Sequence, residues 1–273
     1  MTMFRPNSST TTVLVTGAAG TLGQALIPLL LEAGATVRAL SRRSGTDQPG
    51  LTWLQGDVTD PAALERAVQG VDVVVHLATN AQKAGADLAM GRAVVTAARA
   101  ARVPHLVYMS IVSLERMPGA AYCRDKLAVE QLVVDSGVPH TILRATQFHE
   151  LVALILGMLT LGPVTLVPSG VALQPVDSHV VAQRLAELTL GDVAGRVEDL
   201  YGPEALTFEQ LAQVFHRTRG VRKVVWSVPI PLPLFRAWRG GAALPTGGQA
   251  AGQSWKAWCQ LQWPGTLAGE QRA

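Results

Sequence analysis

The chain has 273 residues, of which 48% are hydrophobic and 16% charged, and its formal net charge is +3. This length allows one large domain or two modest ones, and the apolar content excludes intrinsic disorder. Lysine and arginine are scattered instead of forming a run, so we expect no nucleic-acid partner. The widely spaced Cys123 and Cys259 fit neither a disulfide framework nor a metal site, so we expect a reducing, cytoplasmic compartment and no metal.

Two segments bear on export and on membranes. Residues 1–11 are polar and lack the apolar core of a secretory signal, so we expect a flexible leader. The most apolar stretch, Leu151–Leu166, is shorter than a membrane span and contains Gly157, Gly162 and Pro163. We expect a buried helix followed by a strand there, and no membrane partner.

Short β-branched runs alternate with segments of helical periodicity through the first half of the chain. The predicted strands are Thr12–Thr16, Thr36–Leu40, Leu51–Leu54, Val71–His76, His105–Met109 and Thr141–Arg144. The predicted helices are Leu22–Ala33, Pro61–Val68, Leu88–Ala101 and Tyr122–Ser136. This βαβ alternation predicts an α/β fold, a doubly wound parallel sheet with helices on both faces.

After Phe148 the alternation becomes less regular. The predicted elements there are strands near Val164–Val167 and Ala172–Val176 and helices near His179–Leu190 and Thr207–Thr218. From Pro229 onward, prolines, paired glycines and a tail that carries Trp255, Trp258 and Trp263 suggest an irregular end. We therefore expect a core over residues 12–150, and over residues 151–273 an interleaved small lobe with an irregular C-terminal tail.

The clearest chemical signal is VLVTGAAGTLGQAL at residues 13–26, in which Gly17, Gly20 and Gly23 follow a strand and open a helix. The first interval is one residue longer than in the G-x-G-x-x-G fingerprint. Gly17 would permit the tight turn, Gly20 the approach of a pyrophosphate, and Gly23 close packing of the helix on the sheet. This predicts a Rossmann-type dinucleotide site, whose contacts would be Thr16, Gly17, Ala19, Gly20, Thr21, Leu22 and Gly23.

The end of the second predicted strand indicates which dinucleotide binds. NAD-specific sites usually place Asp or Glu about 20 residues after the glycine turn, where it binds the ribose 2′-hydroxyl. Here Ser41, Arg42 and Arg43 stand instead, and a guanidinium can bind a 2′-phosphate that a carboxylate would repel. The sequence favours NADP(H), with Arg42 ahead of Arg43; the alternative is that both arginines are solvated loop charges.

Several further segments, reaching to about residue 208, carry a family resemblance. They are TGAAGTLG (16–23), GDVTDP (56–61), VVVHLAT (73–79), VYMSIVSLE (107–115), YCRDKLAVEQLV (122–133), ILRATQFHELV (142–152) and QPVDSHVVA (174–182). Together they resemble the short-chain dehydrogenase/reductase superfamily, in its atypical, NmrA-like branch of NAD(P)H-binding proteins.

The resemblance implies site residues beyond the glycine turn. Those expected along the cofactor are Gly56, Asp57 and Val58 near the adenine, Leu77, Ala78 and Thr79 beside the ribose and nicotinamide, and Ser110 and Ile111 at the active site. Those expected on the substrate side, near the nicotinamide, are Gln147, Phe148 and His149, with residues 174–178 in the substrate-side lobe.

Tyr122 and Lys126 reproduce the superfamily's Tyr-x-x-x-Lys pair, with Ser110 upstream as a hydroxyl partner. Residues four apart share one helix face, so both side chains can point into one cleft. The lysine would hold the nicotinamide ribose and lower the tyrosine pKa from about 10, so that the tyrosine protonates a carbonyl oxygen as hydride arrives. Two alternatives are a surface Tyr and Lys without function and an acid/base pair of His149 and Glu150, although a lone histidine is more often structural.

Three functions follow in order of preference. The first is an NADPH-dependent oxidoreductase that reduces a small, apolar or aromatic carbonyl or quinone-type substrate by hydride transfer. The second is a non-catalytic NADP(H)-binding redox sensor, and the third is an enzyme similar to nucleotide-sugar epimerases. The expected partner is the small-molecule substrate, and the expected state is a monomer or homodimer.

Overall fold

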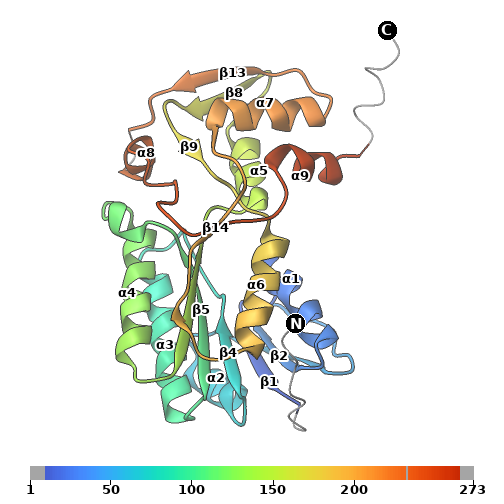
Figure 1. The fold of residues 1–273 in the computed structure, drawn as a ribbon, viewed down its shortest axis with the longest axis vertical. Coiled ribbons are helices and arrows are strands. Elements are labelled where there is room, and N and C mark those ends of the chain that lie inside the picture. Colours follow the sequence, from blue (N-terminus) through green and yellow to red (C-terminus); the bar gives the residue numbers. More distant parts are fainter. Residues whose placement is uncertain (1–9, 232, 265–273) are drawn as a thin grey trace. The chain divides into compact units, whose positions relative to one another are not determined.

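The computed structural model describes residues 10–231 and 233–264 (Figure 1). Most of the predicted leader, residues 1–11, lies outside the described residues. The chain forms two compact units, each made of three segments. Unit 1 comprises the residues up to Met109 with Ala128–Ile142 and Ala182–Val197, and unit 2 comprises Ser110–Leu127, Leu143–Val181 and the residues from Glu198 onward.

The sheet of unit 1 follows the order β3-β2-β1-β4-β5-β6. Its strands are β1 (Thr12–Thr16), β2 (Thr36–Ser41), β3 (Leu51–Gln55), β4 (Val73–His76), β5 (His105–Ile111) and β6 (His140–Ala145), with β10 (Gly195–Arg196) beside the start of β6. The pairs that β1 makes with β2 and β4 are parallel, as are β2 with β3 and β4 with β5. The order reverses at β1, which places the glycine turn at the switch point where such sheets bind ligands.

Helices cover both faces of this sheet, with α3 and α4 on one side and α1 and α6 on the other (Figure 1). The helices are α1 (Thr21–Glu32), α2 (Pro61–Val68), α3 (Ala86–Ala100), α4 (Ala121–Asp135) and α6 (Ser178–Leu190). Leu14, Val74 and Leu106 of the strands pack with Leu64 of α2 and Val129 of α4 in one buried cluster. The parallel strand pairs and the helices on both faces confirm the predicted doubly wound α/β fold. Runs such as VVVH in β4 are buried at every position, as expected for strands of a sheet that is covered on both faces.

Unit 2 has a second core of its own. Its elements are η1 (Leu114–Arg116), α5 (His149–Met158), β7 (Thr160–Leu161), β8 (Val164–Pro168), β9 (Ala172–Leu173), β11 (Leu200–Tyr201), β12 (Leu206–Thr207), α7 (Phe208–Thr218), β13 (Val224–Val228), α8 (Pro233–Arg239), β14 (Gln249–Ala250) and α9 (Trp255–Gln262). Strands β7, β8 and β13 form one sheet, and β9 pairs with β12. The expected helix followed by a strand within Leu151–Leu166 is confirmed by α5, β7 and β8. The helix is only partly buried, because Leu151, Leu154 and Met158 are exposed.

The segment expected to be irregular after Pro229 contains α8, β14 and α9. The Ser254 side chain accepts a hydrogen bond from the Ala257 amide and caps α9. Trp255, Trp258 and Cys259 have helical spacing and are buried in the core of unit 2. Trp255 and Trp258, two of the tryptophans that suggested irregularity, thus lie on the apolar face of a short helix. No helix within the described ranges has both the length and the hydropathy that a bilayer crossing requires.

Two helical glycines give a matched test of packing within the units. A Cβ on Gly91 of α3 would lie 2.5 Å from Cγ2 of Val129 in α4, whereas a Cβ on Gly157 of α5 would meet nothing within 4 Å. We expect Gly91→Ala to lower the free energy of unfolding by about 1–3 kcal/mol, because it overpacks that contact. Gly157→Ala should raise it by about 0.5–1 kcal/mol through helix propensity. Urea unfolding measures both, and equal midpoints would contradict the packing described for α3 and α4.

Candidate cofactor and active-site residues

The glycine turn of unit 1 is built on two close backbone approaches. Gly17 has φ +70°, and a Cβ there would lie 2.6 Å from the Ala78 nitrogen, after β4. A Cβ on Gly23 would lie 2.5 Å from the Ala18 oxygen, so α1 packs directly on the turn. Both positions require glycine for steric reasons, whereas a Cβ on Gly20 would only meet the Gly17 oxygen at 3.2 Å. Gly20 is therefore the position where space remains above the backbone.

The start of α1 suits an anion. Gly20 is its N-cap residue, no side chain caps the helix, and its first turn has no acidic residue. The amides of Thr21, Leu22 and Gly23 thus begin the helix where the backbone carries partial positive charge. This is the arrangement that binds a pyrophosphate in dinucleotide sites, so the turn fits the predicted cofactor.

The arginine pair follows β2, as expected. The Arg43 amide donates to Ser41 Oγ at 3.1 Å, and the Arg43 guanidinium donates to the Ala19 carbonyl in the glycine turn. Arg42 is exposed, and its carbonyl accepts from Gln55 Nε2 at 3.3 Å. Two guanidinium-bearing residues therefore stand beside the turn, and one of them contacts it directly.

Asp57 lies just after β3. Its carboxylate accepts from the Thr59 amide at 2.8 Å and from Thr59 Oγ1 at 2.7 Å. These two hydrogen bonds, with attraction from Arg42, hold the pKa of Asp57 below its usual value. Its neighbour Val58 is buried, and Gly56 donates its amide to the Ser41 carbonyl at 2.9 Å. The loop is thus fixed against the end of β2.

The loop after β4 is held by two buried side chains. Thr16 Oγ1 contacts His76 Nδ1 at 2.8 Å, and the Leu77 amide donates to the same hydroxyl at 3.3 Å. Thr79 Oγ1 donates to the buried Asp87 at 2.7 Å. His76 is itself buried, and its ring stacks on that of Tyr108 with 5.5 Å between the ring centres. These hydrogen bonds therefore fix the backbone of residues 77–79.

In unit 2, Tyr122 and Lys126 lie on one face of α4. Lys126 Nζ is 5.9 Å from the centre of the Tyr122 ring. Lys126 is buried and Tyr122 half-buried. This distance places the ammonium within the range of a cation–π contact with the tyrosine ring.

Ser110 is the second-to-last residue of β5 and belongs to the same unit, and Gln147 follows β6. Ser110 Oγ, Thr146 Oγ1 and Gln147 Oε1 are buried, and none has a hydrogen-bond partner among the residues that the structure describes. Unpaired buried polar atoms are costly, so each of them marks a place where a ligand or water can complete the bonding. The carboxyl ends of β5 and β6 thus carry polar atoms suited to a bound substrate.

His149 is fully buried at the start of α5. Its ring lies 5.5 Å from both Trp255 and Trp258, and Nε2 lies 3.2 Å from the Gln253 carbonyl oxygen. Burial lowers the pKa of His149, so the ring is neutral near pH 7. Its neighbour Glu150 accepts from Ser178 Oγ at 2.6 Å. This environment favours the structural interpretation of His149.

Comparison with known proteins adds independent observations. Residues 17–151 match a family described as NAD(P)H-binding. A Streptomyces griseus (4-alkanoyl-5-oxo-2,5-dihydrofuran-3-yl)methyl phosphate reductase is 37% identical over 212 residues, which cover 74% of this chain and 72% of the relative. The chain belongs to the NmrA-like, NAD(P)H-binding branch of the atypical short-chain dehydrogenases/reductases.

Two further members of this superfamily show how far the likeness extends. An NmrA-like oxidoreductase of Aspergillus flavus is 26% identical over 220 residues, which cover 77% of this chain and 72% of the relative. An Escherichia coli NADPH-dependent quinone oxidoreductase, solved with NADPH, has the same fold with a TM-score of 0.78 at 20% identity, covering 92% of this chain and 99% of that one. The chain therefore belongs to a family of NAD(P)H-dependent oxidoreductases.

The structural roles of two residues, Arg144 and Asp87, were not predicted from the sequence. The guanidinium of the buried Arg144 binds Glu115 through two hydrogen bonds of 2.6 and 3.1 Å, which ties η1 to β6 within unit 2. Asp87 anchors Thr79 and the Asn80 amide in unit 1. Asp87 directly precedes the helix that was predicted from Leu88, and the structure places it in the first turn of α3. Its hydrogen-bond partners are set by the tertiary fold.

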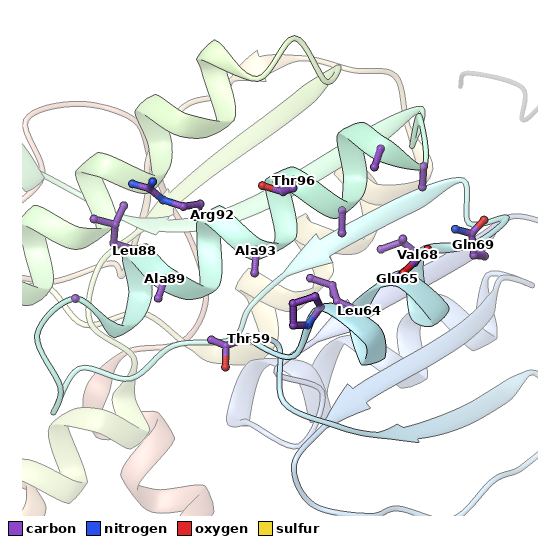
Figure 2. A pocket seen from close by; sticks show the side chains of 15 residues that line it. Thr59, Leu64, Glu65, Val68, Gln69, Leu88, Ala89, Arg92, Ala93 and Thr96 are labelled. Atoms are coloured by element: carbon purple, nitrogen blue, oxygen red, sulfur yellow. The ribbon is translucent and has the colours of Figure 1, made fainter.

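A groove of about 750 Å³ lies elsewhere on unit 1, between α2 and α3 (Figure 2). Leu64 and Val68 line it from α2, and Leu88, Ala93 and Ala97 from α3. None of the predicted site residues lines this groove. The groove is therefore lined by residues other than those predicted to bind the cofactor.

The two approaches at the turn lead to a test of cofactor binding. Gly17→Ala should weaken NADPH binding by about tenfold or more, because the turn must move away from Ala78 to admit a methyl group. Gly34→Ala is the matched control, since Gly34 also has positive φ but nothing lies within 4 Å of its Cβ position. Calorimetric titration of both folded variants measures the effect, and equal affinities would contradict the role of the turn.

Proposed function

We propose that this protein is an NADPH-dependent reductase of a small apolar or aromatic carbonyl or quinone-type acceptor, acting in a reducing, cytoplasmic compartment. The observation that carries the proposal is the placement of Lys126 Nζ 5.9 Å from the Tyr122 ring on one face of α4. A tyrosine so placed can supply the proton that a reduced oxygen atom requires. The cofactor, when bound, supplies the hydride.

The phosphorylated cofactor is proposed from the end of β2. No carboxylate stands there, and Arg43 already contacts the glycine turn through Ala19. Arg42 is exposed beside it and, unlike Arg43, has no guanidinium hydrogen bond to the turn in the described residues. We assign Arg42 to the 2′-phosphate as the first candidate, with Arg43 holding the loop and adding charge.

The remaining residues divide the work on the substrate side. Ser110, at the end of β5, is the hydroxyl partner that we propose for the substrate oxygen. Gln147, with an unpaired buried carbonyl oxygen, and the half-buried Phe148 are proposed to contact the substrate. Because His149 is buried among tryptophans, we propose that it positions Phe148 rather than exchanging protons.

The apolar character of the acceptor is proposed from α5. Leu151, Leu154 and Met158 have helical spacing and are 44%, 59% and 64% exposed. Three large apolar side chains on one exposed helix face, directly after Phe148, suit an apolar ligand. The names of two relatives, a reductase of an alkanoyl furanone phosphate and a quinone oxidoreductase, agree in class with such an acceptor.

The cofactor assignment can be tested by binding alone. Arg42→Ala should weaken NADPH binding by about 10–100-fold, the cost of losing a charge-assisted pair, and leave the weaker NADH binding unchanged. Arg66→Ala, an exposed arginine in the last turn of α2, is the control. A loss of affinity for both nucleotides, or for neither, would remove Arg42 from the phosphate site.

The catalytic assignment needs turnover. Tyr122→Phe should reduce the rate of NADPH oxidation with an accepted quinone or ketone by about 10²–10⁴-fold without weakening NADPH binding, because only a proton donor is lost. Tyr201→Phe, which removes a hydroxyl that donates to the Gly248 carbonyl, is the matched control. A Tyr122→Phe protein with unchanged turnover would reject the role of Tyr122.

The same assay separates catalysis from sensing. A protein that binds NADPH but oxidises it with no member of a broad quinone and ketone panel would contradict the reductase proposal. The remaining function would then be a redox sensor, which must bind a partner differently in its NADPH and NADP⁺ states.

A further inference from the structure

One long stretch of the chain carries cations without acids. Residues 210–269 contain no aspartate or glutamate, and their cations are Arg217, Arg219, Arg222, Lys223, Arg236, Arg239 and Lys256. Because the whole chain has a net charge of +3, the rest of it carries −4. Four of these cations fall within residues 217–223, which run from the last turn of α7 to the start of β13. The net charge of the whole chain is small, so it does not reveal this local concentration of positive charge.

The strand that follows these cations belongs to the sheet of β7, β8 and β13. In this sheet Leu161 pairs with Val164, Val164 with Val224, and Leu166 with Trp226. Paired residues on neighbouring strands point to the same side of a sheet. We call the side formed by these five residues the β8 outer face.

The opposite side of the sheet is covered by α7 (Figure 1). Thr165 there contacts His216 Nε2 at 2.7 Å, and Ser227 donates to Glu209, the acidic residue nearest to β13 in sequence. The outer face is open: Leu161, Val224 and Trp226 are 63%, 52% and 58% exposed. Large apolar side chains gathered on an open sheet face usually mark an interaction surface.

Two contacts fix the cations beside this face. Lys223 Nζ donates to the Gly162 carbonyl at 2.7 Å, and the Val224 amide donates to the Pro163 carbonyl at 2.9 Å. The turn that carries Leu161 is thereby held against the residues that carry Arg222 and Lys223. An exposed tryptophan and aliphatic side chains thus lie next to a concentrated positive charge.

We propose that the β8 outer face, with Arg222 and Lys223, binds the surface of an anionic lipid bilayer. Cations near such a surface are attracted to its headgroups, and tryptophan favours the boundary between headgroups and acyl chains. Leu161, Val224 and Trp226 would enter the interface without any span crossing the membrane. This binding is independent of the reductase chemistry.

Charge decides between this occupant and two others. A second copy docked through a two-fold axis would set the same cations against one another, which disfavours a dimer through this face. A nucleic acid would satisfy the cations and could stack on Trp226, but it offers nothing to Leu161 and Val224. A bilayer with acidic headgroups complements both the cations and the aliphatic side chains.

Sedimentation with lipid vesicles tests the proposal on the full chain. Wild-type protein should bind phosphatidylglycerol-containing vesicles at low salt, bind phosphatidylcholine vesicles weakly, and detach as salt is added. The double variant R222Q/K223Q should bind the anionic vesicles about 30-fold more weakly. Leu161→Ala should lose about tenfold through its smaller apolar area, and Trp226→Ala should also bind more weakly.

Matched controls use exposed residues that are not part of the face. The double variant R66Q/R99Q changes the charge equally on unit 1, and Leu261→Ala removes an exposed leucine of α9. Neither should alter vesicle binding by more than about twofold. Far-ultraviolet circular dichroism checks that each variant is folded.

Four outcomes would overturn the proposal. They are no binding of wild-type protein to anionic vesicles at low salt, binding unaffected by both Leu161→Ala and Trp226→Ala, an equal loss in the R66Q/R99Q control, and a wild-type dimer that Trp226→Ala dissociates. If a DNA duplex displaces the vesicles from the protein, and if the same variants weaken its binding, the face would be assigned to nucleic acid instead.

Discussion

The close approach of the Gly17 backbone to Ala78 is the constraint on which the cofactor half of this protein depends. With a Cβ only 2.6 Å from the Ala78 nitrogen, no other residue lets the turn after β1 lie against the end of β4. That approach aims the uncapped start of α1 and sets residues 77–79 beside it. Thr16, which joins both segments through its hydroxyl, holds them in this register. The same close approach therefore positions both the phosphate-binding start of α1 and the rigid segment after β4.

Unit 2 uses a different means to hold its functional residues. The paired hydrogen bonds between Arg144 and Glu115 join β6 to the segment after β5, from which the chain proceeds to Tyr122. Burial of an arginine is favourable only when its donors are satisfied, so this pair fixes the local geometry. The unpaired buried oxygen atoms of Ser110, Thr146 and Gln147 supply polarity that a substrate can use. The scaffold and the chemistry of this unit are therefore separate sets of side chains.

Net charge was a poor guide to the surface of this protein. A value of +3 and a scatter of lysine and arginine along the sequence indicated no nucleic-acid partner. The absence of any acid from residues 210–269 was equally visible in the sequence, but its meaning depended on where Leu161 and Trp226 lie. Only the pairing of β7 and β13 with β8 brings these residues, far apart in sequence, onto one side of a sheet.

The sequence by itself determined the α/β fold, the glycine turn and the arginine pair, because hydrophobic periodicity and glycine spacing are local and survive without tertiary context. The alternation of VLVT and VVVH with helical segments was enough to predict the parallel sheet. Tertiary structure decided the burial of His149 against Trp255 and Trp258, the anchoring of Thr79 by Asp87, and the helix in the segment expected to be irregular. These depend on side chains distant in sequence that meet only after folding, and no local pattern records such partners.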